Sequence, residues 1–313
     1  MLAEVAVDDR VIRFAVDQSS RDPIADALAS GDFPANAASD LWRHLVKPGW
    51  TVLDVGAHLG TYSLPAAAAG ALVLAIEASP ANAKLLELAV QRNSFENIEI
   101  VNAAAVARAG TVAFKALGPW GHVLFEGESE EDQTVSSVAA VALDDVLAER
   151  GRDHVDLVKI DVEGFELEAL AGLERLLGRE DAPPLLIEAN GHMLNQYGSS
   201  PGDVLAALER HEYKCHQIDP GSERRLVPVR ATDLQPECVT DYLAFKVTPA
   251  GLDPWWVDAP FDRAELIRRV LATCLDDNSS QREYGARLLA VSPAWLLQDE
   301  SVQAVRSTLG DSR

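Results

Sequence analysis

Three charged residues at alternate positions are the clearest sign of chemistry in the sequence. Lys159, Asp161 and Glu163 lie within the segment V-D-L-V-K-I-D-V-E-G-F-E, residues 155–166. At the end of an extended strand their side chains would share one face, while Val158 and Ile160 would face the other way. Charges buried near a strand end are costly unless they pair or bind a ligand. The pattern therefore predicts either a reactive site or an internal ion pair from Lys159 to one of the carboxylates.

A second segment, residues 50–60, reads W-T-V-L-D-V-G-A-H-L-G and predicts a strand, a glycine turn and a helix start. Free backbone N–H groups at a helix start can hold an anionic group. Asp54, Gly56 and Gly60 give the spacing D-x-G-x-x-x-G, which differs from the tighter G-x-G-x-x-G of dinucleotide binders. A ligand with a single carboxylate, such as S-adenosylmethionine, fits this turn. An ordinary strand-to-helix turn that binds nothing explains the segment equally well.

The ends of the next two expected strands suit the nucleoside part of such a ligand. Glu77 follows the glycine turn by about twenty residues, where an acidic side chain can accept both ribose hydroxyls. Its charge would repel a 2′-phosphate, which disfavours NADP. Asn102 and Ala104 could border the adenine. The alternative for Glu77 is a surface glutamate at the start of a loop.

The elements that would position these residues alternate along the chain. Apolar runs predict strands at 51–55, 72–76, 98–101, 155–160 and 184–187, separated by helices that include 80–93 and 165–177. This order indicates a parallel sheet with right-handed crossovers, in which ligands bind beyond the carboxyl ends of the strands. Strands at 213–218 and 242–247 are candidates for an antiparallel edge pair. We predict an α/β, Rossmann-like, mostly parallel seven-stranded sheet with helices on both faces.

Three further parts flank or interrupt this sheet. We expect an N-terminal hairpin and helical segment, a hairpin inserted between about 110 and 141, and a C-terminal helical appendage with helices at 263–275, 281–290 and 301–309. A helix capped by Asp144 is expected after the inserted hairpin. The predicted domains are 1–47, the ligand-binding domain 48–248, and the appendage 249–313.

Composition excludes several classes of function. The 313 residues carry a net charge of −22, which argues against nucleic acid or an anionic membrane surface as a partner. The three cysteines, Cys215, Cys238 and Cys274, are far apart and predict neither a disulfide framework nor a zinc site. No signal peptide and no apolar run of spanning length is evident. We expect a soluble cytoplasmic protein.

Four motifs taken together resemble the FkbM-type S-adenosylmethionine-dependent methyltransferases. In chain order they are V-L-D-V-G-A-H-L-G-T-Y-S, A-I-E-A-S-P-A-N, V-A-L-D-D-V-L and V-K-I-D-V-E-G-F-E. The resemblance spans about residues 48–188 and implies the class I methyltransferase fold. It also implies O-methylation of a sugar or polyketide-type small molecule, a natural product or glycan. Positions carried over are Asp54, Gly56, Gly60 and Glu77 for the cofactor, and Lys159, Asp161, Glu163 and Gly164 for the signature block.

This sequence departs from the family pattern at three places. His58 stands where the family usually has Asn, in a position expected to contact the cofactor. Ser79 separates the acidic Glu77 from Pro80 more widely than in relatives. Phe33 and Pro34 stand where the N-terminal segment of the family tends to carry Glu. These differences leave the predicted fold intact and bear on the substrate.

Methyl transfer to an alcohol needs alignment of donor and acceptor and a general base. We expect Asp161 or His192 to be that base, with Lys159 and Glu163 orienting the acceptor hydroxyl. A variant places Mg²⁺ on Asp161 and Glu188, where it would polarise the hydroxyl.

Two other functions fit parts of the sequence. One is a non-catalytic cofactor-binding or scaffold protein of the same fold. The other is an NAD-dependent dehydrogenase, which the missing G-x-G-x-x-G disfavours. The helical tail could form a lid, a homodimer interface or a dock for a partner.

Overall fold

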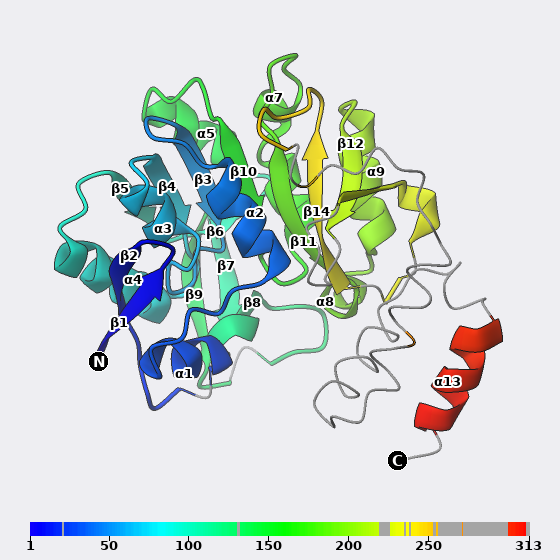
Figure 1. Cartoon of the computed structure of the whole chain (residues 1–313), viewed down its shortest axis with the longest axis horizontal. Helices are drawn as coiled ribbons and strands as arrows, with labels where there is room; N and C mark the ends of the chain where they lie inside the picture. The colour runs from blue at the N-terminus through cyan, green and yellow to red at the C-terminus, as the bar shows by residue number, and fades with distance from the viewer. Residues whose placement is uncertain are drawn as a thin grey trace.

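The computed structural model describes residues 1–20, 22–129, 132–218, 226–234, 236–237, 239–252, 255, 271 and 300–310 (Figure 1). Within these residues a central β-sheet is covered by helices on both faces. Among the helices described there, none has the length and apolar character needed to cross a lipid bilayer.

Eight strands of the described chain form the central sheet, in the order β13-β12-β14-β11-β10-β3-β4-β5. The five parallel strands are β3 (Thr51–Val55), β4 (Leu72–Ile76), β5 (Ile98–Val101), β10 (Leu157–Ile160) and β11 (Leu185–Asn190). The antiparallel strands of the other half are β14 (Val239–Phe245), β12 (Lys214–Ile218) and β13 (Leu226–Val229). The sheet is therefore mixed, with one strand more than predicted. The predicted antiparallel pair of β12 and β14 is confirmed, but β13 rather than this pair forms the edge.

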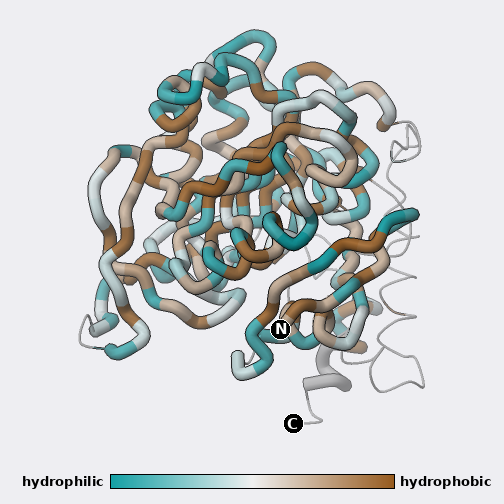
Figure 2. The backbone as a smooth tube through the Cα atoms, turned by 90° about the vertical axis from the view of Figure 1, so that its left-hand side faces the viewer, coloured by the Kyte–Doolittle hydropathy of each residue, from teal (hydrophilic) through white to brown (hydrophobic). Residues whose placement is uncertain are grey.

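Alternate residues of the central strands pack against two different sets of helices. Val52 and Val73 belong to the core under α2 (Ala37–Leu45), α3 (Ser63–Ala68) and α4 (Pro80–Asn93). Leu53 and Leu74 belong to the opposite core. Helices over that second face are α5 (Leu143–Glu149), α6 (Glu166–Ala171), α7 (Glu174–Leu177) and α9 (Pro201–Arg210). Figure 2 shows brown, hydrophobic segments in the interior and teal segments along many outer loops.

Two helix predictions need correction. The helix expected over 165–177 is two shorter helices, α6 and α7, which are separated at Gly172 and Leu173. Asp144 does not cap its own helix, because α5 begins one residue earlier with Ala142 as its N-cap. The carboxylate of Asp144 instead accepts the backbone N–H groups of Arg175 and Leu176, at 2.6 and 3.1 Å. It therefore serves the first turn of α7.

The N-terminal segment begins with the predicted hairpin. Strands β1 (Leu2–Val7) and β2 (Arg10–Ala15) pair in antiparallel register, and α1 (Pro23–Ala29) follows before α2. Hairpin residues such as Val5 and Phe14 are buried in the same core as α2, α3 and α4. The N-terminal segment is therefore joined to one face of the sheet.

The predicted inserted hairpin is also confirmed. Strands β7 (Gly110–Lys115) and β9 (Val135–Val141) pair antiparallel, with Gly110 opposite Ala140 at the base. Short strands β6 (Ala104–Ala105) and β8 (His122–Val123) complete a second sheet of four strands, and η1 (Gly118–Trp120) lies between β7 and β8. Of the expected tail helices, the last is α13 (Glu300–Gly310). The two expected at 263–275 and 281–290 lie outside the described residues, apart from Leu271.

Candidate functional site

The carboxyl ends of four neighbouring strands open into one cavity of about 320 Å³. The chain reverses its direction of progress across the sheet between β3 and β10, which is where open α/β sheets bind ligands. We call the strand-end residues of this cavity its floor: Gly56, Glu77, Lys159, Asp161, Glu163 and Glu188. Sequence-predicted residues from β3, β4, β10 and β11 therefore come together.

The other side of the cavity, its roof, comes from two segments outside the alternating strands and helices. Pro23, Ile24, Pro34, Asn36 and Ser39 belong to the N-terminal segment, and Phe114, Pro119, Trp120 and Val123 to the inserted hairpin. The sequence prediction named none of these as site residues. The signal available in the sequence was the tryptophan Trp120 among the turn residues of the run G-P-W-G-H.

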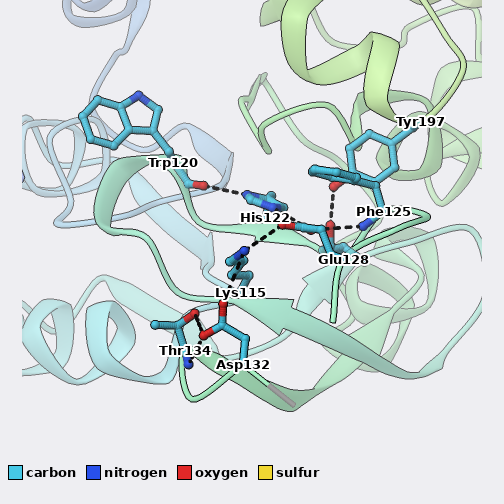
Figure 3. A network of polar contacts seen from close by, with 9 residues as sticks. Lys115, Trp120, His122, Phe125, Glu128, Asp132, Thr134 and Tyr197 are labelled. Carbon is cyan, nitrogen blue, oxygen red and sulfur yellow. Dashed lines mark hydrogen bonds and ion pairs between the residues drawn. The ribbon is translucent and has the colours of Figure 1, made fainter. Parts of the chain in front are cut away.

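A polar network holds the hairpin part of the roof in shape (Figure 3). His122 is buried, with Nδ1 2.8 Å from the carbonyl of Trp120 and Nε2 3.1 Å from a carboxylate oxygen of Glu128. Lys115 donates to the other carboxylate oxygen of Glu128 at 2.9 Å. The hydroxyl of Tyr197 donates to the carbonyl of Val123. The hairpin is thereby fixed both internally and to the chain after α8 (Gly191–Gln196).

The two glycines of the turn after β3 have different roles. Gly56 has φ +80°, and a Cβ there would lie 1.7 Å from the backbone oxygen of Asp161. Only glycine allows β3 and β10 to end so close together. Gly60 has φ +85°, and a Cβ there would lie 2.5 Å from Leu86. Gly60 therefore serves packing against α4 and is not among the residues lining the cavity.

Asp54 lies beneath the cavity and does not line it. It is fully buried, accepts the hydroxyl of Ser63 at 2.6 Å, and has an oxygen 3.8 Å from Nζ of Lys159. Burial raises the pKa of Asp54, and the charge of Lys159 opposes that rise. Its position supports Lys159 and the start of α3 rather than direct contact with a cofactor.

Glu77 and its neighbours form the end of the cavity expected to hold the nucleoside. The two carboxylate oxygens of Glu77 accept backbone N–H groups from His58 at 2.7 Å and Ser79 at 2.8 Å. Ala104 and His58 also line this end. Asn102 is exposed and does not line it, but its side chain donates to the carbonyl of Glu77 at 2.7 Å. Asn102 thus holds the turn that carries Glu77.

Carboxylates crowd the opposite end of the cavity around a single buried lysine. Nζ of Lys159 lies 3.0 Å from the carbonyl oxygen of Gly56 and 3.1 Å from Oδ2 of Asp161. One carboxylate oxygen from each of Asp161, Glu163 and Glu188 lies within 4.8 Å of the other two. The ion pair named as the structural alternative for Lys159 is therefore present, and it lies inside the cavity.

Like charges and burial shift the pKa values of several of these groups upward. Burial and Asp161 together raise the pKa of Glu163 to about 8. Asp161 and burial raise the pKa of Glu188 well above its usual value. Asp241, which lies opposite Glu188 across β11 and β14, has its pKa raised to about 7 by burial and Asp161. Carboxylates this close share protons or attract a cation. Oxygens of Asp161, Glu163 and Glu188 are of the kind that Mg²⁺ prefers.

One predicted catalytic residue lies apart from this group. His192 is exposed in the first turn of α8 and is not among the residues lining the cavity. Asn190, two residues earlier, turns inward and donates to Glu163 at 3.1 Å. Tyr62, which the sequence prediction omitted, lines the cavity with its ring 5.0 Å from Nζ of Lys159.

Comparison with curated proteins finds no match. Solved structures that match this chain include a precorrin-6y C5,15-methyltransferase from Geobacter metallireducens, at 15% identity and TM-score 0.38, covering 67% of this chain and 86% of that chain. A SAM-dependent O-methyltransferase from Thermotoga maritima has 18% identity and TM-score 0.34, covering 67% and 64%. Residues 54–215, more than half of the chain, match the family model described as methyltransferase FkbM domain. This chain therefore belongs to the FkbM family of S-adenosylmethionine-dependent methyltransferases.

Proposed function

We propose that this protein transfers the methyl group of S-adenosylmethionine to a hydroxyl oxygen of a sugar- or polyketide-type small molecule. The observation that carries the proposal is the placement of Lys159, Asp161 and Glu163 in the same cavity as the glycine turn and Glu77. The proposed cofactor site and a set of proton-accepting groups thus share one cavity.

The residues at the nucleoside end fit the cofactor. Glu77 offers carboxylate oxygens at the end of β4 for ribose hydroxyls, and Ala104 leaves room for a flat base. His58 lines this end too, and the backbone around Gly56 is proposed to face the methionine moiety. S-adenosylmethionine supplies a methyl group already activated by the positive sulfonium. The protein has to hold the acceptor oxygen in line with that methyl group.

The carboxylate end supplies the proton acceptor. As the acceptor oxygen forms its bond to the methyl carbon, the carbon–sulfur bond breaks and the hydroxyl proton must leave. Asp161 is our first choice of base, because Lys159 holds one of its oxygens at 3.1 Å and it lines the cavity. Glu163 is the second, since a pKa of about 8 is near the usual working range. His192 does not line the cavity, so we do not propose it as the base.

The test combines product detection with three variants. The protein is incubated with S-adenosylmethionine bearing a labelled methyl group and a panel of glycosides and polyketides, and mass spectrometry locates the product. Asp161→Asn should lower turnover by about 100-fold or more, the usual contribution of a general base. Glu163→Gln tests the second choice. His192→Ala is the matched control and should retain turnover.

Cofactor binding is measured in parallel by calorimetry. If the wild-type protein binds S-adenosylmethionine but methylates no hydroxylated compound, a binding or scaffold role replaces the proposal. If Asp161→Asn and Glu163→Gln both keep normal turnover, the base lies elsewhere and our assignment is wrong.

A metal-assisted form of the proposal uses the same carboxylates. Asp161, Glu163 and Glu188 would hold Mg²⁺, which would polarise the acceptor hydroxyl. Turnover is then compared before and after treatment with a chelator, followed by added Mg²⁺. Full activity after chelation, with no increase on adding Mg²⁺, removes this form and leaves direct proton transfer.

A further inference from the structure

Asp22 and His58 bring two distant segments together at the cofactor end of the cavity. Asp22 is the N-cap of α1, and its Oδ1 accepts the N–H groups of Ile24 at 2.8 Å and Ala25 at 3.2 Å. Its other oxygen, Oδ2, lies 2.9 Å from Nε2 of His58. The side chain of Asp22 is 4% exposed and that of His58 is 15% exposed. One shielded carboxylate therefore both starts a roof helix and contacts the glycine turn.

The backbone of His58 makes a second connection. His58 has φ +50°, a left-handed conformation that is uncommon for residues other than glycine. In this conformation its N–H donates to Oε2 of Glu77 at 2.7 Å while its ring reaches Asp22. The series Asp22, His58 and Glu77 thus links α1, the glycine turn and the end of β4. Glu77 is the residue that we assign to the ribose.

Each member of the Asp22–His58 pair depends on the other. Burial alone would raise the pKa of Asp22, but His58 and the two helix N–H groups outweigh it and lower that pKa. Beyond the contact with Asp22, neither ring nitrogen of His58 has a hydrogen-bond partner among the described residues, although both nitrogens are buried. A buried polar group without a partner is costly. Breaking the contact would therefore affect both segments.

The pair also lies where the two parts of the roof meet. A Cβ placed on Gly118 of the inserted hairpin would lie 3.5 Å from Cβ of Asp22. Pro23 and Ile24, directly after Asp22, line the cavity, as does His58. The position of Asp22 thus sets how the first roof helix stands over the cofactor end.

We propose that Asp22 is a positioning residue which, through His58, fixes the N-terminal segment over the bound cofactor. Cofactor binding and closure of this part of the roof are then linked, and each favours the other. The inference rests on the proposed function, because it takes the ligand to be S-adenosylmethionine. It concerns Asp22 and the N-terminal segment, which precede the residues that match the family model.

The test separates the cap of α1 from the contact with His58. Asp22→Ser keeps a good N-cap residue but is too short to reach the imidazole. It is compared with His58→Asn, with the double variant, and with Asp26→Ser, which makes the same change at an exposed position of α1. Calorimetry with S-adenosylhomocysteine gives Kd, and thermal unfolding checks that each variant is folded.

We expect Kd to rise about tenfold in Asp22→Ser and in His58→Asn, and to rise no further in the double variant, because coupled residues are not additive. Asp26→Ser should bind as the wild-type protein does. In hydrogen exchange, the ligand should protect residues 22–39 of the wild-type protein but not of Asp22→Ser. If the role of Asp22 were purely structural, the ligand would protect residues 22–39 equally in the wild-type protein and in Asp22→Ser.

Three results would overturn the inference. They are wild-type Kd in Asp22→Ser, effects that multiply in the double variant, and equal protection of residues 22–39 in both proteins. If the wild-type protein binds neither S-adenosylmethionine nor S-adenosylhomocysteine, the proposed function falls as well. Normal wild-type binding with unaffected variants removes only the role of Asp22.

Discussion

The floor and the roof of the cavity differ in how their charges are balanced. In the floor, three neighbouring carboxylates face one lysine, and their pKa values rise where they are shifted. In the hairpin part of the roof, Glu128 is matched by Lys115 and His122, whose hydrogen bonds overcome burial and lower its pKa. Glu128 thus has cationic partners beside it, whereas the carboxylates of the floor outnumber its one lysine. Such an excess suits a site that receives a cationic cofactor.

The largest expected effect is a difference in stability between alanine variants of two glycines, one in the floor and one in the roof, that both have positive φ. Gly56→Ala puts a Cβ 1.7 Å from a backbone oxygen of the floor, whereas Gly127→Ala in the roof meets nothing within 4 Å. Both have positive φ, so both changes carry a backbone strain of about 1–3 kcal/mol. We expect Gly56→Ala to lose several-fold more unfolding free energy or to fail to fold. Urea denaturation measures the difference, and equal losses would contradict the close approach of β3 and β10.

The next effect comes from removing the only lysine of the floor. Lys159→Met removes the buried cation beside the fully buried Asp54 and the partly exposed Asp161, which should cost about 3–5 kcal/mol. Lys84→Met, at an exposed position of α4, is the control and should change stability by less than about 0.5 kcal/mol. If Lys159→Met loses as little unfolding free energy as Lys84→Met, the charge of Lys159 does not stabilise the floor.

Floor and roof should respond to pH in opposite directions. In the folded protein the pKa of Glu163, in the floor, is raised to about 8, so its contribution to stability is complete below about pH 4, the pKa of unfolded carboxylates, and is lost as pH rises toward 8. The pKa values of Glu128 and Asp132 are lowered, so their contribution is present at neutral pH and is lost in acid.

Thermal unfolding of the cofactor-free protein between about pH 2 and 9 checks this expectation. Glu163→Gln should reduce the loss of stability between about pH 4 and 8, and Glu128→Gln should reduce the loss at lower pH. If Glu163→Gln leaves the loss between about pH 4 and 8 unchanged, the carboxylates of the floor do not share protons in the way that their spacing indicates.

The smallest effect on stability should come from the exposed tryptophan of the roof. Trp120 is 51% exposed and lines the cavity. Trp120→Ala should change unfolding free energy by less than about 1 kcal/mol but raise KM for the acceptor about tenfold, if the acceptor lies on the indole. Steady-state kinetics with the identified acceptor tests this. An unchanged KM with a large loss of stability would reverse the roles given to roof and floor.

The same contrast explains what the sequence could predict. The floor follows from local signals, because its polar residues lie within or shortly after apolar runs that predict strands. The roof depends on contacts between segments far apart in sequence, such as Asp22 with His58, which no local pattern contains. His192 lies outside the cavity for a local reason: α8 begins at Gly191 and leaves the next side chain exposed.

Strand β13 shows another limit of local patterns. Its four residues are Leu226, Val227, Pro228 and Val229. A proline argues against a central strand, but an edge strand has one side without hydrogen-bond partners and tolerates it. Whether this stretch is an edge depends on where β12 lies, so the eighth strand could not be found before the sheet was assembled.

The way the inserted hairpin joins the chain bears on how such enzymes diversify. Gly110 and Ala140 face each other across β7 and β9, so the two ends of the hairpin leave the domain side by side. An insertion with adjacent ends can be lengthened, shortened or replaced without moving the strands that carry the reacting groups. The hairpin part of the roof is therefore a separable module, which recombination could exchange while the residues of the floor stay in place.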